Sequence, residues 1–60
     1  MEKEPDYIGS YYHLGKLLER NNRKNEALKI YELGMKFSKL KGDNHAYNEL
    51  LMAYDELLDN

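Results

Sequence analysis

Two short polar breaks divide the chain into three stretches in which apolar residues recur every three or four positions. That spacing is typical of amphipathic α-helices, because 3.6 residues per turn bring such positions onto one face. Leu, Lys and Glu dominate, and valine and threonine are absent, which favours helix over strand. We predict a single all-α domain over residues 1–60, with three helices at about 6–20, 24–40 and 44–58. The short breaks require successive helices to pack antiparallel.

Residues at the breaks indicate where the helices begin and end. Asp6, Asn22 and Asp43 stand just before the three stretches, and each side chain can accept hydrogen bonds from the free amides of a first helical turn. Gly42 follows the second stretch and can adopt the left-handed conformation that ends a helix. We therefore expect three N-caps and one glycine terminator.

Composition excludes several classes of protein. The 60 residues include no cysteine, so disulfides and thiolate metal sites are excluded. No apolar run approaches the roughly 20 residues that span a bilayer. The two histidines, His13 and His45, lie in different predicted helices without a carboxylate at zinc-ligand spacing. The net charge of -2 provides no general attraction to nucleic acid or to an anionic membrane. We expect a cytoplasmic protein without metal or cofactor, and with neither nucleic acid nor membrane as a partner.

Catalysis is equally unsupported by the sequence. Gly9 and Gly15 lie within a helical pattern rather than in a phosphate-binding loop, and neither Ser10 nor Ser38 has an activating motif beside it. A basic cluster at residues 20–24 is the one feature suited to nucleic acid, but an acidic third helix would repel phosphate. We expect a protein that is not an enzyme.

The first two predicted helices resemble a tetratricopeptide repeat, a helix–turn–helix unit with a 34-residue period. The resemblance rests on aromatic, large apolar and small residues at matching spacings: Tyr11, Leu14-Gly15, Leu18, Ala27, Tyr31 and Gly34. It implies that the three small residues stand where the helices cross closely, and that the larger ones fill the seam beside them. The proline that often closes such a repeat is absent, and Lys39 stands near its place.

The third predicted helix is similar to the first helix of a following repeat. Tyr47, Leu50-Leu51 and Tyr54 match its pattern, with Leu51 where glycine is usual, and Tyr47 follows Tyr11 after 36 residues. A helix without a partner after it needs no close crossing. The whole chain therefore resembles the C-terminal repeat and capping helix of a small bacterial protein of this family.

The resemblance implies a face of the first helix that a preceding repeat would cover. Tyr7, Ile8 and Tyr11 are its predicted residues, although tyrosine also tolerates simple exposure. Residues 16–41 hold eight basic and three acidic residues, a balance of +5, whereas residues 42–60 hold five acidic and no basic residues, a balance of -5. We predict a non-catalytic module that self-associates through this face, with a two-fold dimer as the simplest form.

The alternative is a monomeric adaptor that binds a peptide in a shallow groove. The family lines its concave groove with the first helix of each repeat, which here implies six residues: Tyr12, Lys16, Glu19, Arg20, Asn48 and Met52. The family's lysine–asparagine carboxylate clamp is not matched, since Tyr12 and Lys16 stand at those positions. Lys16 and Arg20 lie one turn apart and could still meet an acidic peptide.

Overall fold

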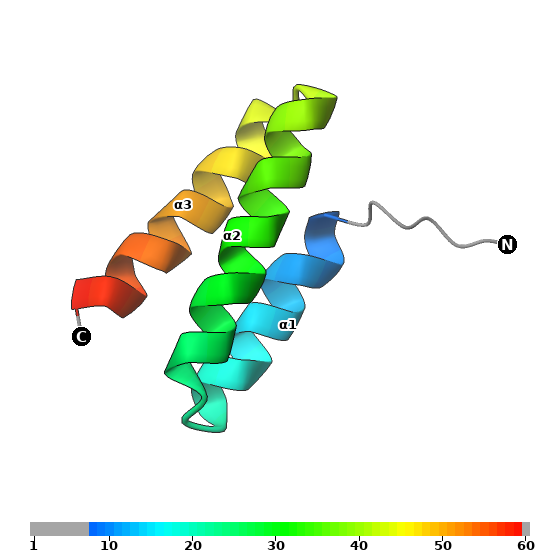
Figure 1. Ribbon diagram of the computed structural model, residues 1–60. Coiled ribbons are helices and arrows are strands. Elements are labelled where there is room, and N and C mark those ends of the chain that lie inside the picture. The colour runs from blue at the N-terminus through cyan, green and yellow to red at the C-terminus, as the bar shows by residue number, and fades with distance from the viewer. Residues whose placement is uncertain (1–7, 60) are drawn as a thin grey trace, which may run out of the picture.

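A computed structural model describes residues 8–59 of the chain, and over that range it consists of three helices without a strand. Helix α1 spans Ile8–Arg20, α2 spans Lys24–Lys41 and α3 spans Asn44–Asp59. Figure 1 shows α2 running between the other two, with each neighbouring pair antiparallel. The predicted all-α fold is confirmed. None of these helices is long and apolar enough to cross a membrane.

The turn between α1 and α2 corrects one predicted cap. Asn22 has a positive φ of 62°, the left-handed conformation, and so terminates α1 instead of capping α2. The Arg23 amide donates to the Leu18 carbonyl at 2.9 Å and the Asn22 amide to the Glu19 carbonyl at 3.1 Å, the paired bonds that close a helix C-terminus. Arg23 then precedes α2 without a side-chain capping bond.

The turn between α2 and α3 follows the sequence prediction. Gly42 adopts φ 74°, and the Asp43 amide donates to the Ser38 carbonyl at 2.8 Å. The Asp43 carboxylate accepts a hydrogen bond from the Ala46 amide at 3.1 Å, so Asp43 caps α3. The cap predicted at Asp6 lies outside the described residues.

Small residues bring the helices into close contact. A Cβ atom at Gly15 would lie 2.7 Å from Cζ of Tyr31, and one at Gly34 would lie 2.8 Å from Leu50 Cδ1 and 2.9 Å from Tyr11 Cβ. Real Cβ atoms do not approach other atoms so closely, so both positions require glycine in this packing. The predicted close approach at small residues is confirmed at Gly15 and Gly34.

The core is centred on α2 and contains few large side chains. Its buried apolar residues are Ala27, Tyr31, Leu50, Ala53 and Leu57. Tyr31 is fully buried, and its hydroxyl donates to the Glu19 carboxylate at 2.5 Å. Burial and this hydrogen bond together raise the pKa of Tyr31 above its ordinary value. A domain this small buries only about 60% of its unfolded surface, so each of these contacts carries a large share of the stability.

Candidate interaction surfaces

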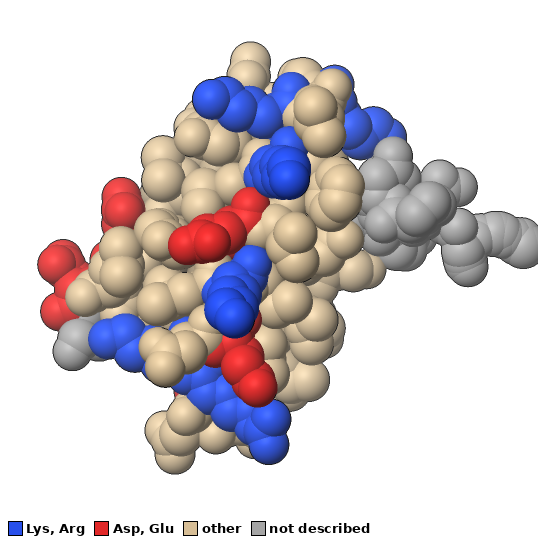
Figure 2. Space-filling model, in the orientation of Figure 1, with Lys and Arg blue, Asp and Glu red and all other residues tan. Residues whose placement is uncertain are grey.

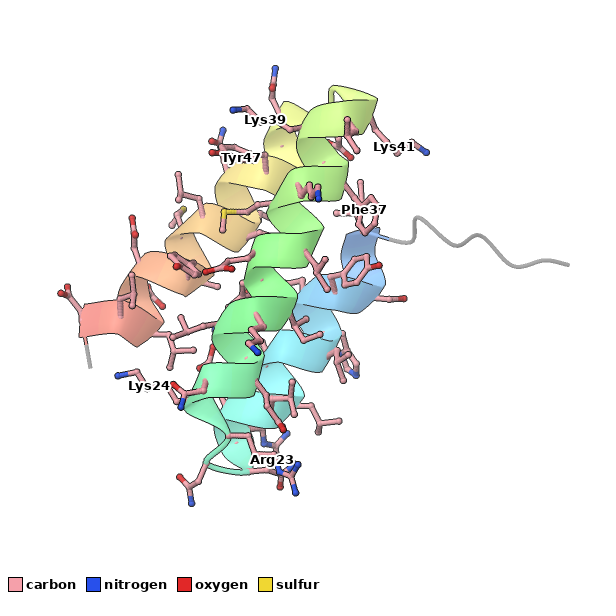
Figure 3. The ribbon with its side chains drawn as sticks, viewed as in Figure 1. Arg23, Lys24, Phe37, Lys39, Lys41 and Tyr47 are labelled. Carbon is pink, nitrogen blue, oxygen red and sulfur yellow. The ribbon has the colours of Figure 1, made fainter. Side chains whose placement is uncertain are left out.

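An apolar surface follows the side of the α1–α2 hairpin that α3 does not cover. The Tyr11 ring stacks on Phe37 with ring centres 5.6 Å apart, and Figure 3 shows Phe37 projecting from α2 toward the first turns of α1. Beyond this pair on α1, Leu14 is 41% exposed and Leu17 is 45% exposed. We call Tyr11, Leu14, Leu17 and Phe37 the α1/α2 face.

Two residues predicted for the self-association face have contacts within the molecule. Ile8 packs partly against the core, and Tyr11 is half-buried against Phe37, so the expectation that they lack an intramolecular partner is wrong. Tyr7 lies outside the described residues. Leu14 was expected to fill the seam, but the seam at this level is occupied by Gly15 and Tyr31, and Leu14 points outward. The exposed leucines of α1, Leu14 and Leu17, lie three and six residues beyond Tyr11, the last residue of the predicted face.

A second surface is a hollow of about 320 Å³ between α1 and α3. Its lining residues are Tyr12, Lys16, Glu49, Met52, Ala53 and Glu56. Both helices pack mainly on α2, and no α2 residue lines the hollow, so it opens on the side of the molecule away from that helix. We call these six residues the α1/α3 groove. Met52 is the apolar group most available there, with 64% of its surface exposed.

Three of the six predicted groove residues line this hollow, namely Tyr12, Lys16 and Met52. Glu19 lies beside them, 4.0 Å from the Lys16 ammonium. Arg20 and Asn48 are exposed, and neither lines this hollow.

The discrepancy on α3 comes from its rotation about its own axis. Because Leu50, Ala53 and Leu57 face the core, the helix directs Glu49 and Glu56 toward α1 in place of the predicted Asn48. Sequence reasoning missed these two glutamates, although the spacing Glu49, Met52, Ala53, Glu56 is that of one helical face.

The groove is electrostatically negative. Lys16 is the single cation among its lining residues, and its ammonium is already held 5.6 Å above the Tyr12 ring and 4.0 Å from Glu19. Glu49 lies 3.2 Å from the imidazole of His45, at a largely exposed position. Within residues 8–59, Glu56 has no ion pair or hydrogen bond through its carboxylate. The arrangement favours a cationic occupant over the acidic peptide expected from Lys16 and Arg20.

The outer side of α2 is a third surface with a distinct charge pattern. A shallow hollow there is lined by Lys29, Glu32, Leu33 and Lys36. Glu32 is engaged by the hydroxyl of Tyr54, which donates to it at 2.8 Å and whose pKa is raised by this bond. In Figure 2 charged side chains follow the line of α2, whereas the neighbouring surface toward α1 is mostly uncharged.

Comparison with known proteins does not assign the chain to a family. No protein-family model matches it, and neither curated proteins nor solved structures include a significant match. The resemblance to tetratricopeptide repeats therefore stays a prediction. Among the described residues, no group of three or more His, Asp or Glu side chains is placed to hold a metal ion.

Proposed function

We propose that this protein is a non-catalytic assembly module whose α1/α2 face associates with the same face of a second copy. The observation that carries the proposal is the exposure of Leu14 and Leu17 beside the stacked Tyr11–Phe37 pair. Single exposed leucines are ordinary on protein surfaces, but here Leu14 and Leu17 follow Tyr11 along α1 at three-residue spacing, so apolar residues continue along the helix from the stacked pair.

The small core gives a physical reason for association. Within residues 8–59, three large apolar side chains are buried, whereas six are exposed: Leu14, Leu17, Leu33, Leu40, Met52 and Leu58. Removing apolar surface from water stabilises a protein by about 25 cal/mol for each Å². A second copy covering the α1/α2 face would therefore add stability that one copy lacks.

A second copy suits this face because the face carries no charge. In an isologous contact the same patch of both copies meets, residue i against j and j against i. A face with charges of one sign would therefore repel itself, whereas leucine and aromatic residues are self-complementary. The resemblance to a repeat unit supports the same proposal, because units of that kind cover such a face with a neighbouring repeat.

Leu14→Lys tests the proposal, and Leu58→Lys is its matched control. Leu58 is 52% exposed on α3, away from the α1/α2 face, so both substitutions add one charge at a comparably exposed leucine. We expect Leu14→Lys to raise the dimer dissociation constant at least tenfold in sedimentation velocity, with helicity retained at high concentration. We expect Leu58→Lys to leave the constant within about twofold of the wild type. Equal effects of the two variants would contradict the proposal.

A further inference from the structure

The outer side of α2 carries two lysines, and the α1/α3 groove carries two glutamates at the same spacing along a helix; the other charged lining residues, Glu32 and Lys16, contact Tyr54 and Glu19 within the molecule. Lys29 and Lys36 are seven residues apart on α2, and Leu33 lies between them with 42% of its surface exposed. Over residues 8–59, neither lysine has an ion pair or a side-chain hydrogen bond. We call Lys29, Leu33 and Lys36 the α2 ridge.

The groove repeats this pattern with the opposite sign. Glu49 and Glu56 are also seven residues apart, and the exposed Met52 lies between them. Seven helical residues span about 10.5 Å, so the two lysines and the two glutamates are separated by the same distance along their helices. If the ridge docked in the groove, Leu33 would reach the hollow at Met52. The ammonium groups of the two lysines on either side of Leu33 would then meet the carboxylates of the two glutamates.

The ridge and the groove lie on opposite sides of one molecule. The buried side of α2 carries Ala27, Tyr31 and Gly34, the ridge is on its outer side, and the groove opens between the two helices that α2 holds apart. A contact between such opposite surfaces cannot close within a pair of copies. It is heterologous, and its repetition produces an open chain or, where the rotation between copies closes, a ring of more than two molecules.

We propose that the α2 ridge of one copy docks in the α1/α3 groove of the next, joining molecules head to tail. The charge complementarity of the Lys29/Lys36 and Glu49/Glu56 pairs favours a second copy as the occupant, and a helix entering a groove between two helices is an established mode of recognition. This contact goes beyond the α1/α2 face, and neither contact requires the other.

Charge-swap complementation tests this contact directly. One variant, Lys29→Glu/Lys36→Glu, has an acidic ridge and an acidic groove, whereas Glu49→Lys/Glu56→Lys has a basic ridge and a basic groove. All four positions are exposed on helices, and circular dichroism checks that each variant keeps its helicity. The variant Asp55→Lys/Asp59→Lys is the control for net charge, because it adds the same charge to α3 outside the groove.

We expect wild type and the Asp55→Lys/Asp59→Lys control to form head-to-tail species alone at low salt. Each swapped variant alone should not, because like charges meet at its contact. An equimolar mixture of the two swapped variants should at least double the weight-average mass of either one, and about 0.5 M salt should reverse the increase, since charge interactions are then strongly screened. Absence of growth in the mixture, or growth of either swapped variant alone beyond a dimer, would overturn the proposal.

The same experiment separates this inference from the proposed function. Both swapped variants retain the α1/α2 face, so each should remain a dimer by itself if that face associates. Dimers that do not grow on mixing would refute the head-to-tail contact and leave the proposed function standing. Growth on mixing of variants that are monomeric alone would support the head-to-tail contact and refute association through the α1/α2 face.

Discussion

Alanine at Gly15 is the sharpest probe of how closely α1 and α2 pack. The added Cβ would lie 2.7 Å from Cζ and 2.8 Å from Cδ1 of Tyr31, where ordinary contacts between such atoms are 3.4–4 Å. The Tyr31 ring cannot swing aside easily, because it is fully buried and its hydroxyl is bonded to Glu19. The two helices would have to separate by several tenths of an ångström.

Two opposing effects decide the result of Gly15→Ala. Alanine is about 1 kcal/mol better than glycine within a helix, which favours the variant. Overpacking a buried contact costs about 1–3 kcal/mol, and more when the surrounding groups cannot move. With three ring atoms of Tyr31 within 3 Å of the new methyl group, we place the cost at the upper end and expect a net loss of about 1–2 kcal/mol.

Gly9→Ala is the matched control on the same helix. A Cβ at Gly9 would meet nothing within 4 Å, so only the gain in helix propensity, about 0.5–1 kcal/mol, remains. Urea unfolding followed by circular dichroism at one fixed protein concentration measures both variants, because association makes the midpoint concentration-dependent. A Gly15→Ala variant as stable as Gly9→Ala would refute the close packing of α1 on Tyr31.

Two further predictions concern a helix cap and a buried hydroxyl. Asp43→Ala removes the hydrogen bond to the Ala46 amide and should lower the free energy of unfolding by about 1 kcal/mol in urea titrations. The control Asp55→Ala, at an exposed position, should change the free energy of unfolding by less than about 0.5 kcal/mol. Equal effects of the two variants would contradict the cap. The raised pKa of Tyr31 means that the unfolded chain loses this proton first as the pH rises above the ordinary value of 10.0. The contribution of Tyr31 is therefore fully present below pH 10 and falls above it by at most about 1.4 kcal/mol per pH unit. Between pH 9 and pH 11 the free energy of unfolding should therefore fall more for the wild type than for Tyr31→Phe, which has no hydroxyl to titrate. An equal fall for the two proteins would contradict the raised pKa of Tyr31 in the folded protein.

Helix positions were predictable because local signals agree with the packing. The apolar periodicity, Gly42 and Asp43 all act within a few residues. The end of α1 and both ends of α2 and α3 lie within one residue of the predictions, whereas the start predicted at about residue 6 lies outside the described residues. Asn22 was assigned the wrong role because an asparagine between two helices can cap the second or terminate the first in the left-handed conformation. Which role Asn22 takes depends on the angle between α1 and α2, and the residues around the turn do not determine that angle by themselves.

The interaction surfaces were less predictable, because they depend on how each helix is rotated. Helix α3 has apolar residues on more than one side, and packing selects Leu50 and Ala53 for the core. That choice directs Glu49 into the groove in place of the adjacent Asn48, since neighbouring residues on a helix differ by about 100°. With Glu49 and Glu56 in its lining and Arg20 outside it, the groove has more acidic than basic residues, whereas the predicted set had two basic residues and one acidic residue.

The most direct test of self-association is the mass of the wild-type protein in solution, measured by sedimentation over a wide range of concentrations with helicity followed in parallel. We expect species of at least two copies at high concentration, and on dilution a fall toward one copy accompanied by loss of helicity. A joint loss of mass and helicity would show that folding of this small core depends on association of the copies. A fully helical monomer at every concentration would contradict the account.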